Sequence, residues 1–455
     1  MPDKRRMWWS ILVLGMALLP RVGWSSGPKH PAKVVVIGLD GVSLNLLEPF
    51  TEKGITPHLG ALMKEGTRGH LDSIWPLRTP QVWTTIVTGK LPGQHGIWDH
   101  LSNTYFNPPT IRTKKKQRVT RESRRSQALW GLLGQAGYRT LSVGWMATWP
   151  AEKVPKGVMV APIELMGDRR QTTIKGSFYS GEKGLVSPKS LRKRVDKLIV
   201  NPTDLAREEV KAFADAPPKG DPFYKGLNPL ERYVYGLSWS LARAKSVEAL
   251  TLDLVAKTKP DVVFSYFQCS DSLLHRFWIF HKGPEAIRQR LKNHGYPTDR
   301  SEELYRRFGN VVEQCYRDVD ARVGRILEAT RNDETLVLIV SDHGFGNAPI
   351  PHQMKAEPFS GDHLDDGILL ATARGIKKGA RIQGANVTDI TPTVLHWLGL
   401  EVGKDMVGKV LTDLWEKKAK PIRYRPSYEK TPQNENEYPK GWPPRKKPRR
   451  SADNN

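Results

Sequence analysis

Three aspartates follow closely on apolar stretches of the sequence. The runs KVVVIGL, DVVFSYFQ and ETLVLIV are followed, directly or within three residues, by Asp40, Asp271 and Asp342. Continuous apolar runs rich in β-branched residues are typical of parallel strands buried on both faces. Ligands of open parallel sheets bind outside the carboxyl ends of the strands. We therefore expect the three carboxylates to meet at one edge of a sheet.

Three histidines accompany these acids. His275 follows Asp271 by four residues, so both side chains share one face if a helix begins there. His343 directly follows Asp342, and His363 lies in a loop before a further strand. Acids gathered at one edge would repel each other, and a pair of divalent cations would neutralise them. Mixed nitrogen and oxygen ligands favour Zn²⁺ over Mn²⁺ or Fe²⁺.

Thr79 stands at the predicted start of a helix, in the stretch LRTPQVWTTIVTGKLPGQHGIW. Backbone N–H groups at a helix N-terminus are unsatisfied and attract anions, so a hydroxyl there is placed to meet a phosphate-like group. The alternative is an ordinary helix cap, because threonine before proline is common at that position.

Helical and strand patterns alternate along the rest of the chain, which is typical of an α/β sheet. Further strands are expected at residues 139–145 and 368–373, and helices at residues 58–66, 126–137, 238–257, 311–330 and 388–400. We expect one catalytic domain over residues 31–414, with insertions at about 101–125, 166–237 and 283–307, and a basic, Pro-rich tail without fixed structure over 415–455.

The first 26 residues predict an export signal or an N-terminal anchor. A basic start is followed by an apolar run and by small residues, the layout of a signal peptide. We therefore expect an exported protein, which is periplasmic, secreted or anchored by its N-terminus. With two cysteines, Cys269 and Cys315, the chain is not a disulfide scaffold, and whether the two pair stays open.

The formal net charge of +24 favours anionic partners. Basic clusters at residues 112–125, 169–194 and 440–450 fit an anionic envelope surface, such as acidic lipid, a cell-wall polymer or lipopolysaccharide. Nucleic acid is not expected as a dedicated partner of an exported protein. The alternative for each cluster is a solvated face or an unstructured tail. The oligomeric state stays open.

Six segments, in this order, carry a resemblance to a known family: GLDG, RTPQVWTTIVTGKLPGQHGI, SDSLLH, SDHGFG, DHLDDGILLATARG and TDITPTVLHWLGL. From about residue 34 to 414 the chain resembles the alkaline phosphatase superfamily, and within it the type I phosphodiesterase/nucleotide pyrophosphatase group. The resemblance implies an alkaline phosphatase-like α/β fold. That fold has a large, mostly parallel central sheet, helices on both faces and cap or lid insertions.

The resemblance also implies roles for these residues. Thr79 would be a metal-activated nucleophile that forms a phosphothreonine, which water then hydrolyses. One metal site would comprise Asp271, His275 and His363, and the other Asp40, Asp342, His343 and Thr79. Two residues are expected at the substrate. His100 stands where the family usually has an asparagine, 21 positions after the nucleophile. Apart from the resemblance, Arg78 could steer an anion, and the alternative is a solvent-facing side chain.

The predicted function is hydrolysis of small phosphoesters, namely phosphodiesters or nucleotide pyrophosphates. An alternative is action on phosphomonoesters, phosphonates or lipid-linked phosphates of the envelope, by hydrolysis or transfer. A third hypothesis is a non-enzymatic binder of anionic polymers. Sulfatase relatives are disfavoured because Thr79 and Pro80 do not fit their C/S-x-P-x-R motif. Phosphoglycerate mutase relatives are disfavoured because they use serine and are cytosolic.

Overall fold

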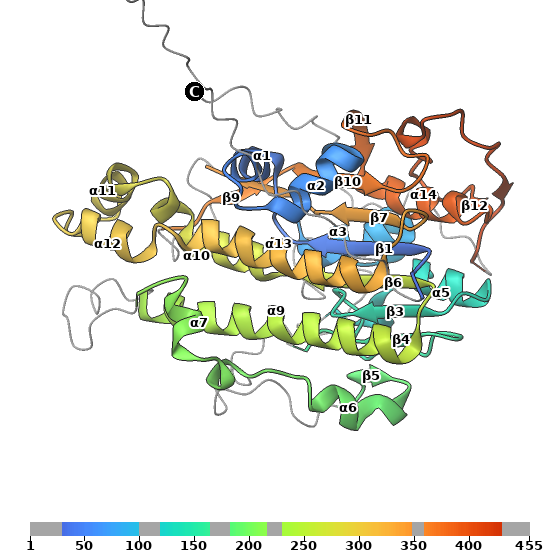
Figure 1. Ribbon diagram of the computed structural model, residues 1–455, viewed down its shortest axis with the longest axis horizontal. Coiled ribbons are helices and arrows are strands. Elements are labelled where there is room, and N and C mark those ends of the chain that lie inside the picture. The colour runs from blue at the N-terminus through green and yellow to red at the C-terminus, as the bar shows by residue number, and fades with distance from the viewer. Residues whose placement is uncertain (1–29, 100–118, 164–182, 216–229, 348–358, 430–455) are drawn as a thin grey trace, which may run out of the picture.

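The computed structural model describes residues 30–99, 119–163, 183–215, 230–347 and 359–429 (Figure 1). Within these residues a nine-stranded sheet carries helices on both faces, which confirms the predicted fold class. The predicted signal or anchor, and much of the first two insertions, lie outside the described residues. Among the described helices, none is both long and apolar enough to span a membrane.

The strand order is β11-β2-β10-β7-β1-β6-β3-β4-β5. The five strands from β7 to β4 are mutually parallel, whereas β10 runs antiparallel to both of its neighbours and β5 is antiparallel to β4. The strands comprise β1 Val34–Leu39, β2 Thr67–Asp72, β3 Thr140–Val143, β4 Val158–Val160, β5 Val186–Ser187, β6 Val262–Phe267, β7 Leu336–Val340, β10 Asp366–Thr372 and β11 Ala380–Asn386.

Two apolar cores, one on each face of the sheet, explain the continuous apolar runs. In β1, Val35 and Ile37 belong to one core, while Val34 and Val36 belong to the other. The first core is covered by α1 Leu44–Glu52, α2 Pro57–Glu65, α9 Leu230–Thr258, α10 Cys269–His281 and α13 Val311–Thr330. The second is covered by α3 Thr79–Thr88, α5 Leu129–Gln135 and α14 Ile390–Trp397.

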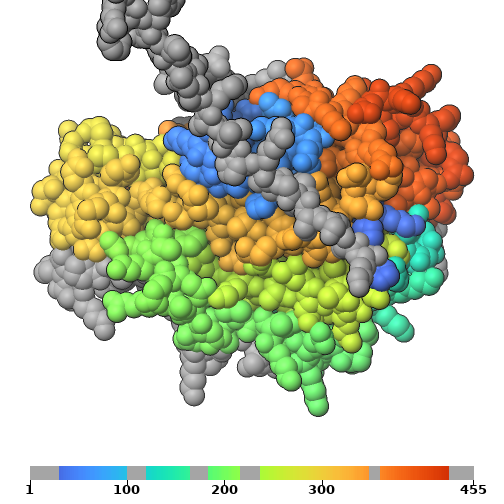
Figure 2. Space-filling view, in the orientation of Figure 1, coloured from blue at the N-terminus to red at the C-terminus, as the bar shows by residue number. Residues whose placement is uncertain are grey.

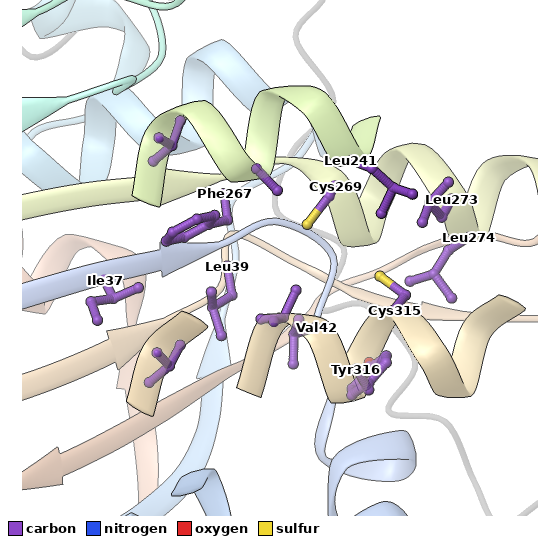
Figure 3. Packing of buried hydrophobic residues seen from close by; sticks show 14 of the residues in the cluster. Ile37, Leu39, Val42, Leu241, Phe267, Cys269, Leu273, Leu274, Cys315 and Tyr316 are labelled. Atoms are coloured by element: carbon purple, nitrogen blue, oxygen red, sulfur yellow. The ribbon is translucent and has the colours of Figure 1, made fainter. Parts of the chain in front are cut away.

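Both cysteines lie in the first core. Figure 3 shows Cys269 on α10 and Cys315 on α13 among Leu241, Leu273 and Leu274. Both are buried, free thiols in this structure. The hydrogen bond with Cys269 and burial raise the pKa of the Cys315 thiol well above its usual range.

The third predicted insertion, at about residues 283–307, is helical. It forms α11 Pro284–Asn293 and α12 Ser301–Phe308 (Figure 1), whose yellow atoms make up one end of the molecule in Figure 2. Ile287, Leu291, Leu304 and Phe308 are buried, and Phe308 packs against Phe277 and Phe280 of α10. Apart from short 3-10 helices, the remaining described helices and strands are α4 Pro92–His95, α6 Arg192–Asp196, α7 Arg207–Lys211, β8 Gly344–Gly346, β9 Asp362–Leu364, β12 Val402–Gly403 and β13 Tyr424–Arg425.

The predicted boundary of the unstructured tail is wrong by about fifteen residues, because residues 415–429 have defined contacts. Strand β13 pairs with β12, and Glu429 lies 3.1 Å from the buried ammonium of Lys90. That ammonium also lies 2.7 Å from Asp405. The polar composition of the segment concealed these contacts, since a buried ion pair between distant residues leaves no local pattern.

Removing the Lys90 charge should strongly destabilise the fold. The Lys90 side chain is 2% exposed, so Lys90→Met would leave Asp405 and Glu429 as poorly solvated, unpaired carboxylates. We expect the free energy of unfolding in urea to fall by about 3–5 kcal/mol. A matched control is Arg381→Met, which breaks a surface pair with Glu48 and should cost at most about 1 kcal/mol. Equal losses in the two variants would contradict this account.

His95 should make the fold acid-sensitive. It is fully buried at the end of α4, where Nδ1 accepts the Ile97 N–H and Nε2 bonds the Thr85 hydroxyl at 3.0 Å. Burial, aided by the charge of Arg124, lowers the pKa of His95 to about 3. Protonation therefore favours the unfolded chain, and the contribution of neutral His95 is lost as the pH falls from about 6.5 towards 3.

We expect acid to destabilise the wild type more than the variant His95→Gln. Between pH 7 and pH 4, the wild type should lose about 3 kcal/mol more unfolding free energy than His95→Gln, which cannot titrate in this range. Urea titrations at several pH values measure this difference. Parallel stability curves for the two proteins would show that His95 is not held neutral by the fold.

Candidate active site

The three strand-end aspartates converge as the sequence predicted. Asp40, Asp271 and Asp342 follow β1, β6 and β7, which are adjacent in the sheet. Asp271 donates its backbone N–H to the Asp40 carbonyl at 3.1 Å. Gly41, whose φ is +72°, turns the chain directly after Asp40 and donates its N–H to Asp342 at 3.3 Å. The sheet edge therefore holds three carboxylates at close range.

His343 lies among these carboxylates. Its Nε2 atom is 3.4 Å from Asp40 Oδ1, 3.3 Å from Asp342 Oδ2 and 3.9 Å from Asp271 Oδ1. Asp40, Asp342 and His343 have no exposed side-chain surface. The imidazole thus faces all three acids of the cluster.

His275 and His363 lie beside Asp271. His275 is one helical turn after Asp271 in α10, and its Nε2 atom is 3.1 Å from Asp271 Oδ1. His363 in β9 places Nε2 at 3.2 Å from the same oxygen and 2.8 Å from His275 Nε2. The imidazole rings of His343 and His363 stack with centroids 3.7 Å apart. All six predicted metal-ligating Asp and His side chains are therefore brought together.

Two groups of side chains could each hold a metal ion. One comprises Asp40, Asp342 and His343, and the other Asp271, His343 and His363, with ligand atoms within 4.8 Å of one another. The family resemblance assigned His343 to one site and His275 to the other. In the structure His343 belongs to both groups, and His275 adjoins the second.

The donor atoms of the first group fit a cation. Asp40 Oδ1, Asp342 Oδ2 and His343 Nε2 are buried, and none hydrogen-bonds to the described part of the chain. Buried polar atoms are rarely left without a partner, because each unmade hydrogen bond costs stability. A divalent cation would satisfy all three atoms at once.

The electrostatics of the cluster also fit a cation. Burial, followed by repulsion from Asp342 and Asp271, raises the pKa of Asp40 well above its usual range. Burial and the nearby Asp271 charge do the same to the pKa of Asp342. Burial also pushes the pKa of Asp271 upward, but His275 and His363 hold it well below its usual range. Nearby positive charge is thus needed for all three acids to ionise together.

Each histidine of the cluster bonds an oxygen through Nδ1, which leaves Nε2 turned towards the carboxylates. The pairs are His343 with Gly344 O (3.0 Å), His363 with Leu77 O (3.2 Å) and His275 with Ser360 Oγ (3.1 Å). In metal sites such second contacts orient the imidazole and fix its tautomer. The rings are therefore held in a ligating orientation.

Tyr266 and Trp83 orient Asp40, a role that the sequence did not predict for either residue. The Tyr266 hydroxyl donates to Asp40 Oδ2, and the Trp83 indole N–H lies 3.4 Å from the same oxygen. A Cβ atom on Gly38 would lie 2.6 Å from the Trp83 ring, so a glycine is needed there. The alternation of β6 places Tyr266 on the same side of the sheet as Trp83, which was the available signal.

Thr79 is the first residue of α3 and is 4% exposed. The carbonyl of Leu77, two residues earlier, accepts the bond from His363, so the start of α3 is tied directly to the cluster. The predicted placement of Thr79 at a helix start is confirmed. Arg78 is partly buried at the position before the helix, and His100 lies outside the described residues.

A family model and the solved structure of one alkaline phosphatase agree with this architecture. The family model described as "Type I phosphodiesterase / nucleotide pyrophosphatase" matches residues 34–451. The solved structure of the alkaline phosphatase PafA aligns with a TM-score of 0.52 and 13% identity, covering 86% of this chain and 100% of that chain. Human ectonucleotide pyrophosphatase / phosphodiesterase 5 aligns with a TM-score of 0.47 and 13% identity, covering 85% of this chain and 100% of that chain.

Curated relatives match over a shorter part of the chain. A 2,3-bisphosphoglycerate-independent phosphoglycerate mutase from Colwellia psychrerythraea is 34% identical over 112 residues, or 24% of this chain and 20% of that protein. The chain thus matches about a fifth of the length of this relative. The family model covers most of the chain, and the PafA structure shares its fold.

Proposed function

Because this chain belongs to the type I phosphodiesterase / nucleotide pyrophosphatase family, we propose that it hydrolyses phosphodiesters or nucleotide pyrophosphates with two divalent metal ions, through a phosphothreonine at Thr79. The observation that carries this proposal is the buried Asp/His cluster, tied through Leu77 and His363 to the start of α3. The mixed nitrogen and oxygen donors favour Zn²⁺.

In this proposal Thr79 is the nucleophile. Its hydroxyl oxygen attacks phosphorus in line, the bond from phosphorus to the leaving oxygen breaks, and the hydroxyl proton is released. When bound, divalent cations would lower the pKa of a coordinated hydroxyl and would stabilise negative charge on the phosphoryl oxygens. The backbone N–H groups at the start of α3 meet the same oxygens. Water then cleaves the phosphothreonine and restores Thr79.

The side chains around the cluster orient it for this chemistry. Tyr266 and Trp83 occupy Asp40 Oδ2 and leave Oδ1 free to act as a ligand. Arg78 adds positive charge next to the nucleophile, which favours an anionic substrate. At position 100 this chain has a histidine where the family usually has an asparagine. We propose that this difference changes how the substrate is oriented at the site.

Purified protein tests the proposal with bis-p-nitrophenyl phosphate and metal analysis. We expect turnover that EDTA abolishes and that added Zn²⁺ restores, and a higher kcat/KM for this diester than for p-nitrophenyl phosphate. Absence of metal-dependent diester turnover would refute the proposal. A preference for the monoester would support instead a phosphomonoesterase at the same cluster.

We also propose that the protein is exported and that its basic clusters contact an anionic envelope surface. The N-terminal pattern and the net charge of +24 support this location. Cell fractionation of the full chain, compared with a chain lacking residues 1–26, tests it. Equal distribution of the two proteins would contradict export.

A further inference from the structure

Cys269 and Cys315 are the two cysteines of the chain, and the fold brings them together although they are 46 positions apart in the sequence. Cys269 is the first residue of α10, and Cys315 lies in the second turn of α13, which packs against α10. Figure 3 shows their sulfur atoms turned towards each other, and the two thiols share a hydrogen bond. Direct contact between two cysteine side chains is the first geometric requirement for a disulfide bond.

The contact lies behind two of the turns that carry predicted metal ligands. Cys269 precedes Asp271 by two residues at the start of α10. Tyr316, directly after the second cysteine in α13, accepts the N–H of Ser43 at 3.5 Å, in the turn that follows β1. A covalent bond between the two sulfur atoms would therefore join the helices that support both turns.

The burial of the pair decides when such a bond could form. Both residues are 3% exposed, so an oxidant has little access to them in the folded protein. The hydrogen bond with Cys269 and burial hold the pKa of the Cys315 thiol well above its usual range, which disfavours the thiolate that exchange requires. The bond would therefore have to form before α10 and α13 close over the sulfur atoms.

We infer that Cys269 and Cys315 form a disulfide bond as the exported chain folds, and that this bond joins α10 to α13. The inference goes beyond the proposed phosphodiester chemistry, but it rests on the proposed export, because disulfides persist in oxidising compartments. As the S–S bond forms, the two thiols lose two protons and two electrons. A small-molecule or protein disulfide accepts them, and its own S–S bond breaks to give two thiols.

Refolding of the full chain tests the pairing. The reduced, unfolded protein is refolded either with reduced and oxidised glutathione or with the reductant TCEP, desalted, and unfolded again with N-ethylmaleimide. Among molecules that regain the native circular dichroism, we expect no maleimide adduct after the glutathione buffer and two after TCEP. Tryptic peptides should be cross-linked through Cys269 and Cys315 in the first case. The control Cys315→Ser should give no such cross-link.

Two maleimide adducts on the wild type refolded with glutathione, or glutathione bound to either cysteine in place of the cross-link, would overturn the inference. The bond should also raise the melting temperature of the wild type by roughly 2–8 °C over its reduced form. The matched control Cys269→Ala/Cys315→Ala should melt at the same temperature after both refolding protocols. Equal melting temperatures of the two wild-type forms would show that the bond does not hold α10 against α13.

Expression in a bacterium distinguishes this inference from the proposed export. The full chain should be isolated without free thiols, and a chain lacking residues 1–26 should be isolated with two. Two free thiols in both chains would overturn the bond in the cell. The refolding experiment would then show whether the pairing itself or the export had failed, because it depends only on the contact between the two cysteines.

Discussion

Replacing Thr79 with alanine should abolish phosphodiester turnover almost completely. We expect kcat to fall by roughly 10³- to 10⁶-fold, because removal of a nucleophile leaves only binding and charge stabilisation. Bound metal should stay near the wild-type level, since the Asp and His donors remain. Steady-state assays with bis-p-nitrophenyl phosphate measure the effect.

Two further substitutions in α3 distinguish a loss of catalysis from a loss of folding stability. Thr79→Ser keeps a hydroxyl and should retain activity well above that of Thr79→Ala. Thr84→Ala removes a buried hydroxyl that donates to the Pro80 carbonyl at 2.6 Å, so it should lower stability but leave activity within about tenfold. Activity of Thr79→Ala close to that of the wild type would refute Thr79 as the nucleophile.

The second large effect is expected at His343, because this residue belongs to both candidate metal groups. His343→Ala should weaken the binding of both ions by at least about 100-fold, whereas His275→Ala should weaken one of them. Elemental analysis after dialysis against a limiting chelator should then find two ions per wild-type chain, one in His275→Ala and fewer than one in His343→Ala.

His281→Ala is the control for removing a histidine from this region. His281 lies on α10 with His275, but its ring packs against Phe50 and it is not a predicted metal ligand. It should bind metal as the wild type does. Two tightly held ions in His343→Ala would show that this imidazole is not a shared ligand.

Sequence patterns predicted the central strands and the convergence of the acids well. The runs that became β1, β6 and β7 are apolar because each strand is buried on both faces, so their direction and their carboxyl ends could be inferred without coordinates. The helix α13 was predicted at its observed bounds, Val311–Thr330. Its apolar residues recur with a helical period over five turns.

The edge of the sheet could not be predicted in the same way. Strand β2 has the sequence TRGHLD, and its burial alternates, so charged residues interrupt any apolar run. Strand β11 is an edge strand with several exposed residues and a register shift between Ile382 and Ala385. Both strands are stabilised by their neighbours in the sheet, which a local pattern does not reveal.

The contacts around the cluster also needed the structure. The spacing of Asp342 and His343 indicated ligands, but only the fold shows His343 facing Asp271 as well. The Tyr266 hydroxyl reaches Asp40 across adjacent strands that are 226 residues apart in sequence. Family membership is shown by the match over residues 34–451, while the individual residue roles stay predictions.

In the proposed reaction, Thr79 carries the phosphoryl group during turnover. Acid quenching of the enzyme within its first turnovers of bis-p-nitrophenyl phosphate, followed by peptide mass spectrometry, tests this directly. We predict that the peptide containing Thr79 gains the mass of one p-nitrophenyl phosphoryl group, that fragmentation places it on Thr79, and that Thr79→Ala gains none. Active wild-type enzyme quenched in its burst phase with no adduct, or with the adduct on another residue, would show that Thr79 is not the nucleophile.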